Sequence, residues 1–333
     1  MNWPLLVRLF LWPYSVVYGA AVRLHAWLYQ QGVYPVKRLS VPVVSVGNLT
    51  VGGTGKTPMV LWLAERFLSE KKHVAILSRG YRGSSGTSDE IEMLKSRLGN
   101  RVAFGVGPDR HKEGLRLQKE YPIDIFLLDD GFQHQELARD VDIVLVDSTR
   151  PLHREHLIPA GRLREPISAM LRASVVVFTR VQQAPFVAPA TQKFPRLPIF
   201  PASTELSGFK QVFEGKAADR ADNLPQPAFA FCGIGNPEAF FADLERWHIN
   251  VVGRSRFRDH HPYSDEDVQK ISKSAKELGA VVVLTTEKDL QNLANKKFSL
   301  PLYCCEIALD IPDSAQFWKV ITQLLPANTG PSL

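Results

Sequence analysis

The sequence predicts an α/β protein, with a parallel sheet covered by helices on both faces and a smaller C-terminal α/β domain. Short, nearly continuous apolar runs alternate with stretches whose apolar residues recur at helical spacing, which is typical of a parallel sheet buried between helices. The 333 residues exceed the roughly 250–300 residues that one hydrophobic core usually supports, so a second domain is expected. Hydrophobic residues make up 45% of the chain, which excludes global disorder, collagen and a coiled coil.

The charge balance is mildly basic and does not favour nucleic acid as a partner. Lys and Arg number 40 against 34 Asp and Glu, which gives a formal net charge of +6. The sequence has no basic stripe interleaved with aromatic residues, the pattern that stacks bases. A phosphate-bearing ligand or a membrane surface is the expected anionic partner, and no obligate protein partner is evident.

Residues 1–35 predict an amphipathic helix that associates with a membrane. The segment has basic residues, many aromatic ones and no acid, and Pro13 is expected to be the first residue of the helix. One face carries Tyr14, Val17, Tyr18, Ala21, Leu24 and Leu28, and the other carries Ser15, Gly19, Arg23 and Gln30. Such a helix suits the headgroup layer of a bilayer.

A membrane-spanning helix and a signal peptide are both disfavoured for this segment. A spanning helix needs about 20 mostly apolar residues, whereas the uncharged run 9–22 is shorter and contains Pro13. In a signal peptide, Arg8 would fall inside the apolar core. An ordinary helix packed on the core stays open, although the aromatic density and the lack of acids favour the membrane surface.

Residues 36–205 are expected to form the main domain. Buried strands are predicted at 41–46, 73–78, 123–128, 141–146 and 175–179. A helix is predicted over 58–70, because Val60, Leu63, Ala64 and Phe67 recur at helical spacing.

The remaining residues predict a connection and a second, smaller domain. Gly, Lys, Asp and Pro accumulate over 206–226, which favours a linker or a small hairpin. The alternation resumes over 227–333, with strands expected at 228–232, 251–257 and 281–285 and helices at 237–247 and 264–278.

A glycine-rich loop joins the strand at 41–46 to the helix at 58–70. It contains Gly52, Gly53, Thr54, Gly55, Lys56 and Thr57. The glycines allow successive backbone N–H groups to face one concavity, Lys56 can reach terminal phosphates, and the Thr57 hydroxyl can ligate Mg²⁺. The sequence therefore predicts a P-loop NTPase-like site for ATP and Mg²⁺. The loop is a variant, because Thr50 replaces the first glycine of the consensus.

Two carboxylates, Asp129 and Asp130, directly follow the strand at 123–128. Ligands of open α/β sheets bind at the carboxyl ends of the strands, so these acids are candidate holders of Mg²⁺ or its waters beside the P-loop. A turn that caps a helix is the alternative without a metal.

Short motifs follow one another along almost the whole chain. They are GNLT at 47–50, GGTGKTP at 52–58, SRGY at 78–81, DE at 89–90, DDGFQH at 129–134, PAG at 159–161, LRE at 163–165, DH at 259–260 and TEKD at 286–289. In this order, and with the aromatic N-terminus, the sequence resembles the tetraacyldisaccharide 4'-kinase family, the lipid A kinases of Gram-negative bacteria.

The resemblance implies transfer of the γ-phosphoryl group of ATP to the 4'-hydroxyl of a tetraacyldisaccharide 1-phosphate, which forms lipid IVA. It also implies Mg²⁺ as cofactor and a location at the cytoplasmic face of the inner membrane. Asp89 and His260 match a catalytic pair in which Asp89 is the base, and Lys56 serves the phosphates. The residues alone do not distinguish His260 from His261, and the family motif favours His260. Closure of the two domains is expected to bring His260 to Asp89.

Five further residues are candidates for substrate contacts: Glu90, Arg110, Gln133, His134 and Arg164. For Arg110 and Arg164 the ordinary alternative is a solvated side chain or a surface ion pair.

A different class of function, a membrane-associated P-loop ATPase switch or adaptor without lipid kinase activity, is the main alternative. Such switches place Lys directly before the Gly-Gly pair, and that position is Val51. A GTPase is disfavoured because Asp289 follows Lys288 directly, whereas the guanine-binding motif has one residue between them. An adaptor has no need of a base such as Asp89.

Overall fold

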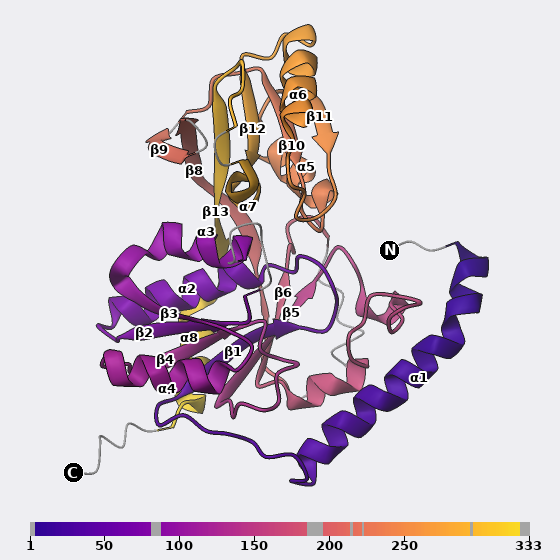
Figure 1. Ribbon diagram of the computed structural model, residues 1–333, viewed down its shortest axis with the longest axis vertical. Coiled ribbons are helices and arrows are strands. Elements are labelled where there is room, and N and C mark those ends of the chain that lie inside the picture. Colours follow the sequence, from indigo (N-terminus) through magenta and orange to yellow (C-terminus); the bar gives the residue numbers. More distant parts are fainter. Residues whose placement is uncertain are drawn as a thin grey trace. The chain divides into compact units, whose positions relative to one another are not determined.

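The computed structural model describes residues 4–80, 88–184, 196–213, 216–221, 223–293 and 296–326. The chain divides into two compact units (Figure 1). Unit 1 comprises residues 1–80, 98–203 and 310–333, and unit 2 comprises residues 81–97 and 204–309. These boundaries differ from the expected continuous domains 36–205 and 227–333. The described segment 88–97 belongs to unit 2, and the described segment 310–326 belongs to unit 1.

Unit 1 is built on a parallel sheet of seven described strands in the order β3-β2-β4-β1-β5-β6-β7. The strands are β1 (Val43–Asn48), β2 (Val74–Ser78), β3 (Val102–Val106), β4 (Ile125–Asp129), β5 (Val141–Asp147), β6 (Val175–Thr179) and β7 (Ile199–Pro201). Every residue of the five inner strands is buried, which confirms the predicted two-sided sheet. The edge strands β3 and β7 were not predicted.

The helices of unit 1 that cover this sheet are α2 (Lys56–Ser69), α4 (Arg110–Glu120) and α8 (Ser314–Leu324). Figure 1 shows α2 and α4 on opposite faces of the sheet, as right-handed crossovers in opposite directions require. Short 3-10 helices lie at 99–101, 152–154 and 167–172.

The C-terminal helix α8 belongs to unit 1 because its aromatic side chains pack on α2. The rings of Trp62 and Phe317 lie 5.3 Å apart, and those of Phe67 and Trp318 lie 4.6 Å apart. The Trp318 indole N–H also donates to Glu70 at 2.6 Å. Aromatic side chains contribute much of the stabilising energy of an interface of this kind. The spacing of the apolar residues in α8 does not show which helix they pack against.

The N-terminal helix α1 (Leu5–Gln30) starts earlier than expected, since Pro13 lies inside it and not at its first position. Proline keeps a φ compatible with a helix and removes one hydrogen bond. Pro13 is exposed, so water can replace the lost partner.

Unit 2 contains a sheet of six described strands in the order β11-β10-β12-β13-β8-β9. The strands are β8 (Ser203–Phe213), β9 (Lys216–Ala221), β10 (Ala228–Cys232), β11 (Val251–Arg256), β12 (Val282–Thr286) and β13 (Leu302–Asp310). The described pairs β10–β11, β10–β12 and β12–β13 are parallel. The antiparallel pair β8–β9 forms the hairpin that was one of two predictions for 206–226.

The helices of unit 2 are α3 (Asp89–Leu98), α5 (Pro237–Arg246), α6 (Asp265–Glu277) and α7 (Glu287–Leu290), with a 3-10 turn at 291–293. A capping box formed by Ser264 and Asp267 begins α6 at the predicted place. The alternation predicted for the second domain is therefore present, although α3 also belongs to this unit.

Candidate active-site residues

The loop between β1 and α2 has the backbone conformation of an anion site. Gly52 and Gly55 have φ values of 107° and 90°, in the left-handed region that side chains disfavour. Gly55 is the N-cap of α2, whose first two residues are Lys56 and Thr57. The N–H groups at this helix end have no partner within the helix, so they can bind phosphate oxygens.

The first half of the loop is paired with a distant segment. The Val51 N–H donates to the Arg162 carbonyl at 2.8 Å, and the Arg164 N–H donates to the Leu49 carbonyl at 2.7 Å. Thr50 lies between these two bonds in an antiparallel bridge. An extended residue needs no positive φ, which explains why Thr50 can stand where the consensus has glycine.

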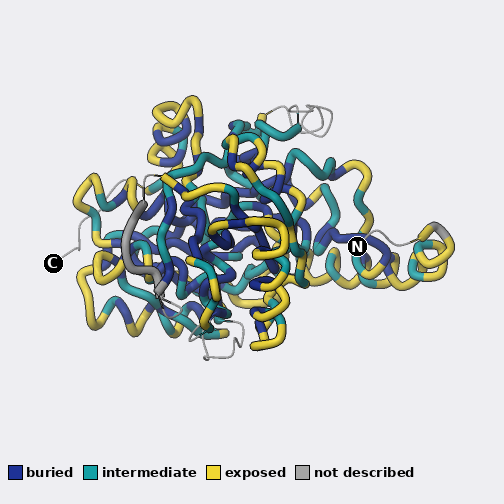
Figure 2. Tube along the Cα trace, turned by 90° about the horizontal axis from the view of Figure 1, so that it is seen from above, coloured by how far each residue is buried: buried dark blue, intermediate teal, exposed yellow. Residues whose placement is uncertain are grey.

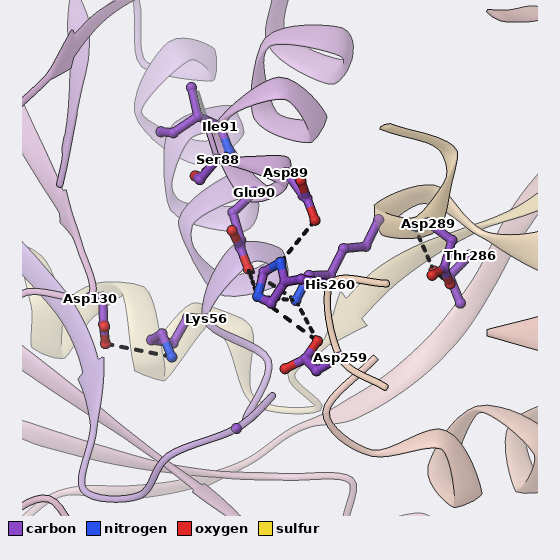
Figure 3. Close-up of polar contacts among 12 residues, drawn as sticks. Lys56, Ser88, Asp89, Glu90, Ile91, Asp130, Asp259, His260, Thr286 and Asp289 are labelled. Carbon is purple, nitrogen blue, oxygen red and sulfur yellow. Dashed lines mark hydrogen bonds and ion pairs between the residues drawn. The ribbon is translucent and has the colours of Figure 1, made fainter. Parts of the chain in front are cut away.

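Asp130, at the end of β4, is held by two cations of unit 1. The Arg164 guanidinium donates to both of its carboxylate oxygens at 2.9 and 2.8 Å, and Lys56 Nζ lies 3.5 Å from Oδ1 (Figure 3). Burial opposes ionisation, but hydrogen bonds and charge from Arg164 and Lys56 outweigh it and hold the pKa of Asp130 well below its usual range. Asp130 is therefore a permanent anion beside the loop lysine.

Asp129 has a different environment from its neighbour. It is buried at the carboxyl end of β4, directly opposite Val46 of β1, and its Oδ2 lies 3.5 Å from the Ser78 hydroxyl. Oxygen ligands of this kind are those that Mg²⁺ prefers.

The other predicted contact residues of unit 1 support the strand ends. The Gln133 amide donates to the Asn48 carbonyl at 2.9 Å and to Glu165 at 3.0 Å. His134 Nδ1 lies 3.4 Å from Arg110 Nη1. Burial, followed by the charge of Arg110, lowers the pKa of His134 to about 4, so its ring is neutral at physiological pH.

In unit 2, Asp89 and His260 form the predicted pair. Asp89 begins α3, and its Oδ2 accepts a hydrogen bond from His260 Nδ1 at 2.8 Å (Figure 3). A second hydrogen bond reaches the same oxygen from Asn292 Nδ2 at 2.9 Å. Both partners lie within unit 2, so the expected domain closure is not needed to form the pair. His261, the other candidate, instead contacts Asp267 at 3.0 Å.

The two members of the pair shift each other's pKa in opposite directions. Burial alone raises the pKa of Asp89, but the hydrogen bonds from His260 and Asn292 outweigh burial and lower it. The hydrogen bond to Asp89 raises the pKa of His260 against the effect of burial. Asp89 is therefore ionised at neutral and mildly acidic pH, as a base must be.

A lysine extends this acid–base cluster. Lys288 Nζ lies 3.2 Å from His260 Nε2, 3.1 Å from Glu90 Oε1 and 3.0 Å from Asp259 Oδ1. Burial lowers the pKa of Lys288, but the two carboxylates outweigh it, and the net shift is upward. Glu90, which was predicted to contact the substrate, thus helps to hold the Lys288 ammonium group beside the His260 imidazole.

Two positioning residues were not predicted from the sequence. Asn292 belongs to none of the motifs and fixes Asp89 Oδ2. Asp289 is buried and accepts hydrogen bonds from the Gly233 N–H and the Tyr263 hydroxyl, each at 2.8 Å. Gly233 in turn accepts from the His260 N–H at 3.1 Å, so Asp289 fixes the turn that carries the histidine. The TEKD motif at 286–289 could have pointed to Asp289 as a functional residue. No sequence motif includes Asn292.

Comparisons with known proteins cover almost the whole chain. The sequence profile of the family described as "Tetraacyldisaccharide-1-P 4'-kinase" matches residues 7–326. A protein of Geobacter metallireducens named tetraacyldisaccharide 4'-kinase is 39% identical over 297 residues, which cover 84% of this chain and 86% of that protein. A protein of the same name from Geobacter sulfurreducens is 36% identical over 330 residues, covering 93% of this chain and 92% of that protein.

A solved structure of a protein of this kind is similar to almost the whole chain. The crystal structure of LpxK from Aquifex aeolicus in complex with ATP superimposes with a TM-score of 0.76 at 29% identity, covering 96% of this chain and 100% of that one.

Proposed function

The chain belongs to the tetraacyldisaccharide 4'-kinase family, and from this premise we propose which of its residues carry out the reaction. It is an ATP-dependent lipid kinase that transfers the γ-phosphoryl group to the 4'-hydroxyl of a tetraacyldisaccharide 1-phosphate and forms lipid IVA. The observation that carries this conclusion is the match of one kinase family to residues 7–326.

The phosphate loop of unit 1 is the proposed ATP site. N–H groups of Gly52–Thr57 hydrogen-bond the phosphates, and Lys56 exchanges the Asp130 carboxylate for phosphate oxygens when ATP arrives. Asp130 tolerates this exchange because Arg164 continues to hold it through two hydrogen bonds. The exchange brings the Lys56 ammonium group to the phosphate oxygens that carry the negative charge during phosphoryl transfer.

The donors present fit Mg²⁺. Thr57 on the first turn of α2 and the buried Asp129 on β4 offer hard oxygen atoms, and these two residues would hold the ion. Asp130, also predicted as a ligand, joins them only if it gives up an ion pair with Lys56 or Arg164. When bound, the ion would offset the negative charge of the phosphates during transfer.

Asp89 is the proposed general base. Both of its described hydrogen bonds use Oδ2, so Oδ1 accepts the proton of the 4'-hydroxyl while the oxygen forms its bond to the γ-phosphorus. The bond from that phosphorus to the bridging oxygen breaks, and ADP leaves. His260 keeps the carboxylate oriented and ionised.

The remaining predicted residues have supporting roles in this proposal. Arg164 and Gln133 fix Asp130 and the end of β1, and Glu90 fixes Lys288. Arg110, which is buried with Nη1 3.4 Å from His134 Nδ1, is the proposed contact of a phosphate group of the substrate.

The apolar face of α1 supports contact with a membrane surface. The large exposed apolar side chains of α1 are Leu6, Val7, Leu9, Phe10, Trp12, Tyr14, Val16, Val17, Leu24 and Trp27. Figure 2 shows the helix after the N-terminus mostly in the colours of exposed and intermediate residues. Within the part of the chain that the structure describes, no helix combines the length and the apolar character needed to cross a membrane.

Part of the polar face of α1 contacts the protein, whereas Arg23 and Gln30 of that face are exposed. Ser15 is buried, with its hydroxyl 2.9 Å from the Leu157 carbonyl, and a Cβ added at Gly19 would lie 2.6 Å from Leu157 Cδ1. Tyr18, expected on the apolar face, donates its hydroxyl to the Arg164 carbonyl at 2.7 Å. Since a helix packed on a core buries its apolar face, the exposure of the large apolar side chains of α1 supports the interfacial helix.

Changing the exposed face tests the membrane proposal without removing contacts to the protein. Leu9→Glu with Val17→Glu, at positions 62% and 70% exposed, is expected to weaken binding to anionic phospholipid vesicles by about 100-fold or more, since each side chain loses its apolar burial. Vesicle flotation measures the bound fraction. Leu171→Glu, at an exposed leucine outside α1, is the control. Undiminished flotation of the double variant would remove the basis for an interfacial helix.

A single assay tests the function. The full chain is incubated with γ-labelled ATP, Mg²⁺ and the disaccharide 1-phosphate, and the lipid fraction is separated. A kinase is expected to yield a labelled lipid with two phosphate groups. Labelled inorganic phosphate without labelled lipid would instead indicate the ATPase switch.

A further inference from the structure

Two carbonyl groups of the phosphate loop are fixed from outside by side chains at the end of β6. The Thr179 hydroxyl donates to the Thr54 carbonyl at 2.9 Å, and Arg180 Nη1 donates to the Gly53 carbonyl at 2.9 Å. All four residues belong to unit 1. Neither Thr179 nor Arg180 lies in a recognised motif, so the function described above does not use them.

These bonds determine where the neighbouring N–H groups point. A trans peptide unit is planar, and its C=O and N–H groups lie on opposite sides. Holding the carbonyls of Gly53 and Thr54 toward β6 therefore directs the N–H groups of Thr54 and Gly55 away from β6. These donors belong to the loop that binds phosphates. Because glycine has little conformational preference of its own, the loop needs such an external restraint.

Both side chains are themselves rigidly held. Thr179 is 1% exposed, and its Cγ2 lies 3.5 Å from the position of a Cβ at Gly55. Arg180 Nη1 also donates to Asp147 Oδ2 at 2.6 Å, and Asp147 is buried at the end of β5. The restraint on the loop is thus anchored in the ends of two inner strands.

We propose that Thr179 and Arg180 are positioning residues for the ATP phosphates, which prearrange the N–H groups of the loop before ATP binds. The proposal rests on the ATP site assigned to this loop. Without the two side chains, ATP itself has to order the loop, and the cost appears as weaker binding. Thr179 is the sharper test because loss of its hydroxyl changes no charge.

Thr179→Val removes the hydroxyl and keeps the shape. It is expected to raise the KM for ATP and the Kd of a non-hydrolysable ATP analogue by about 2- to 10-fold, the usual range for one uncharged hydrogen bond. The kcat at saturating ATP and the KM for the lipid disaccharide are expected to stay unchanged, as for a loss of uniform binding to one substrate. The measurements are steady-state kinetics with each substrate varied and calorimetric titration of the analogue.

The matched control is Thr322→Val on α8. The Thr322 hydroxyl bonds only carbonyls of its own helix in the described contacts, at Trp318 and Lys319. This variant is expected to leave both KM values unchanged.

Arg180 supplies a second, independent variant. Arg180→Met removes the donor to the Gly53 carbonyl and is expected to raise the KM for ATP above the wild-type value. Arg180→Lys keeps a cationic donor and is expected to restore most of the affinity for ATP.

The outcomes separate this proposal from the function it rests on. An ATP KM of Thr179→Val within twofold of the wild type overturns the positioning role. Parallel changes in both KM values with a lower unfolding temperature also overturn it, because they indicate a structural role. Failure of the wild-type chain to bind ATP would instead refute the assigned ATP site.

Discussion

Replacing Lys56 with alanine is expected to lower kcat/KM for lipid phosphorylation by at least about 100-fold, the usual loss when one preorganised charge donor is removed. Lys56 begins α2 and lies 3.5 Å from Asp130. Arg164, the other cation at Asp130, is already engaged by both oxygens of that carboxylate, so it is not expected to replace the lost ammonium group. Transfer of label from γ-labelled ATP to the lipid measures the effect.

The fold is expected to survive this change. Asp130 keeps two hydrogen bonds from Arg164, so the substitution does not leave a buried carboxylate alone. Lys119→Ala, at an exposed lysine of α4, is the matched control and is expected to behave as the wild type. If Lys56→Ala kept more than about a tenth of the activity, the loop lysine would not be the residue that neutralises the transferring group.

Replacing Asp89 with asparagine is expected to lower kcat by about 100- to 10,000-fold, the range for loss of a general base, with little change in the KM for ATP. Asparagine has the same shape and lacks the charge that accepts a proton. The effect falls on kcat because a base acts in the transition state. Steady-state kinetics with each substrate varied separate the two constants. Normal turnover by this variant would show that the base lies elsewhere.

The pH profile distinguishes a base from a residue that only maintains structure. In the wild type the pKa of Asp89 is lowered, so kcat/KM falls only when the pH drops through that lowered pKa. His260→Asn replaces the imidazole, whose positive charge and hydrogen bond lower the pKa of Asp89, with a neutral amide while burial remains, so the acid limb is expected to move to higher pH. His261→Asn is the control, because His261 contacts Asp267 and not Asp89. Identical acid limbs in all three proteins would contradict the assignment.

The loop of the proposed phosphate site could be predicted in large part because its residues are contiguous. A buried strand, a glycine-rich loop and a helix start within residues 43–57 specify one local geometry. The antiparallel pairing of the loop with Arg162 and Arg164 could not be read in this way, since it joins segments more than a hundred residues apart. The variant position Thr50 became understandable only with that pairing.

Only part of the acid–base cluster around Asp89 could be predicted from the sequence. Asp89 and His260 were assigned through a family motif, and Asn292, whose amide bonds Asp89 across 203 positions of sequence, was not found. The TEKD motif contains Lys288, but the motif did not show which residues this lysine contacts. In the structure Lys288 contacts His260 and Glu90.

The sequence by itself determined the parallel sheet, the phosphate loop and the amphipathic N-terminal helix, because each follows from residues that are neighbours in the chain. Only the tertiary structure decided that segment 88–97 joins unit 2, that α8 returns to unit 1, and that Ser15 on the polar face of α1 contacts the protein. The physical reason is that periodicity and local conformation depend on adjacent residues, whereas the choice of packing partner depends on how much apolar surface and how many polar groups the whole chain satisfies together.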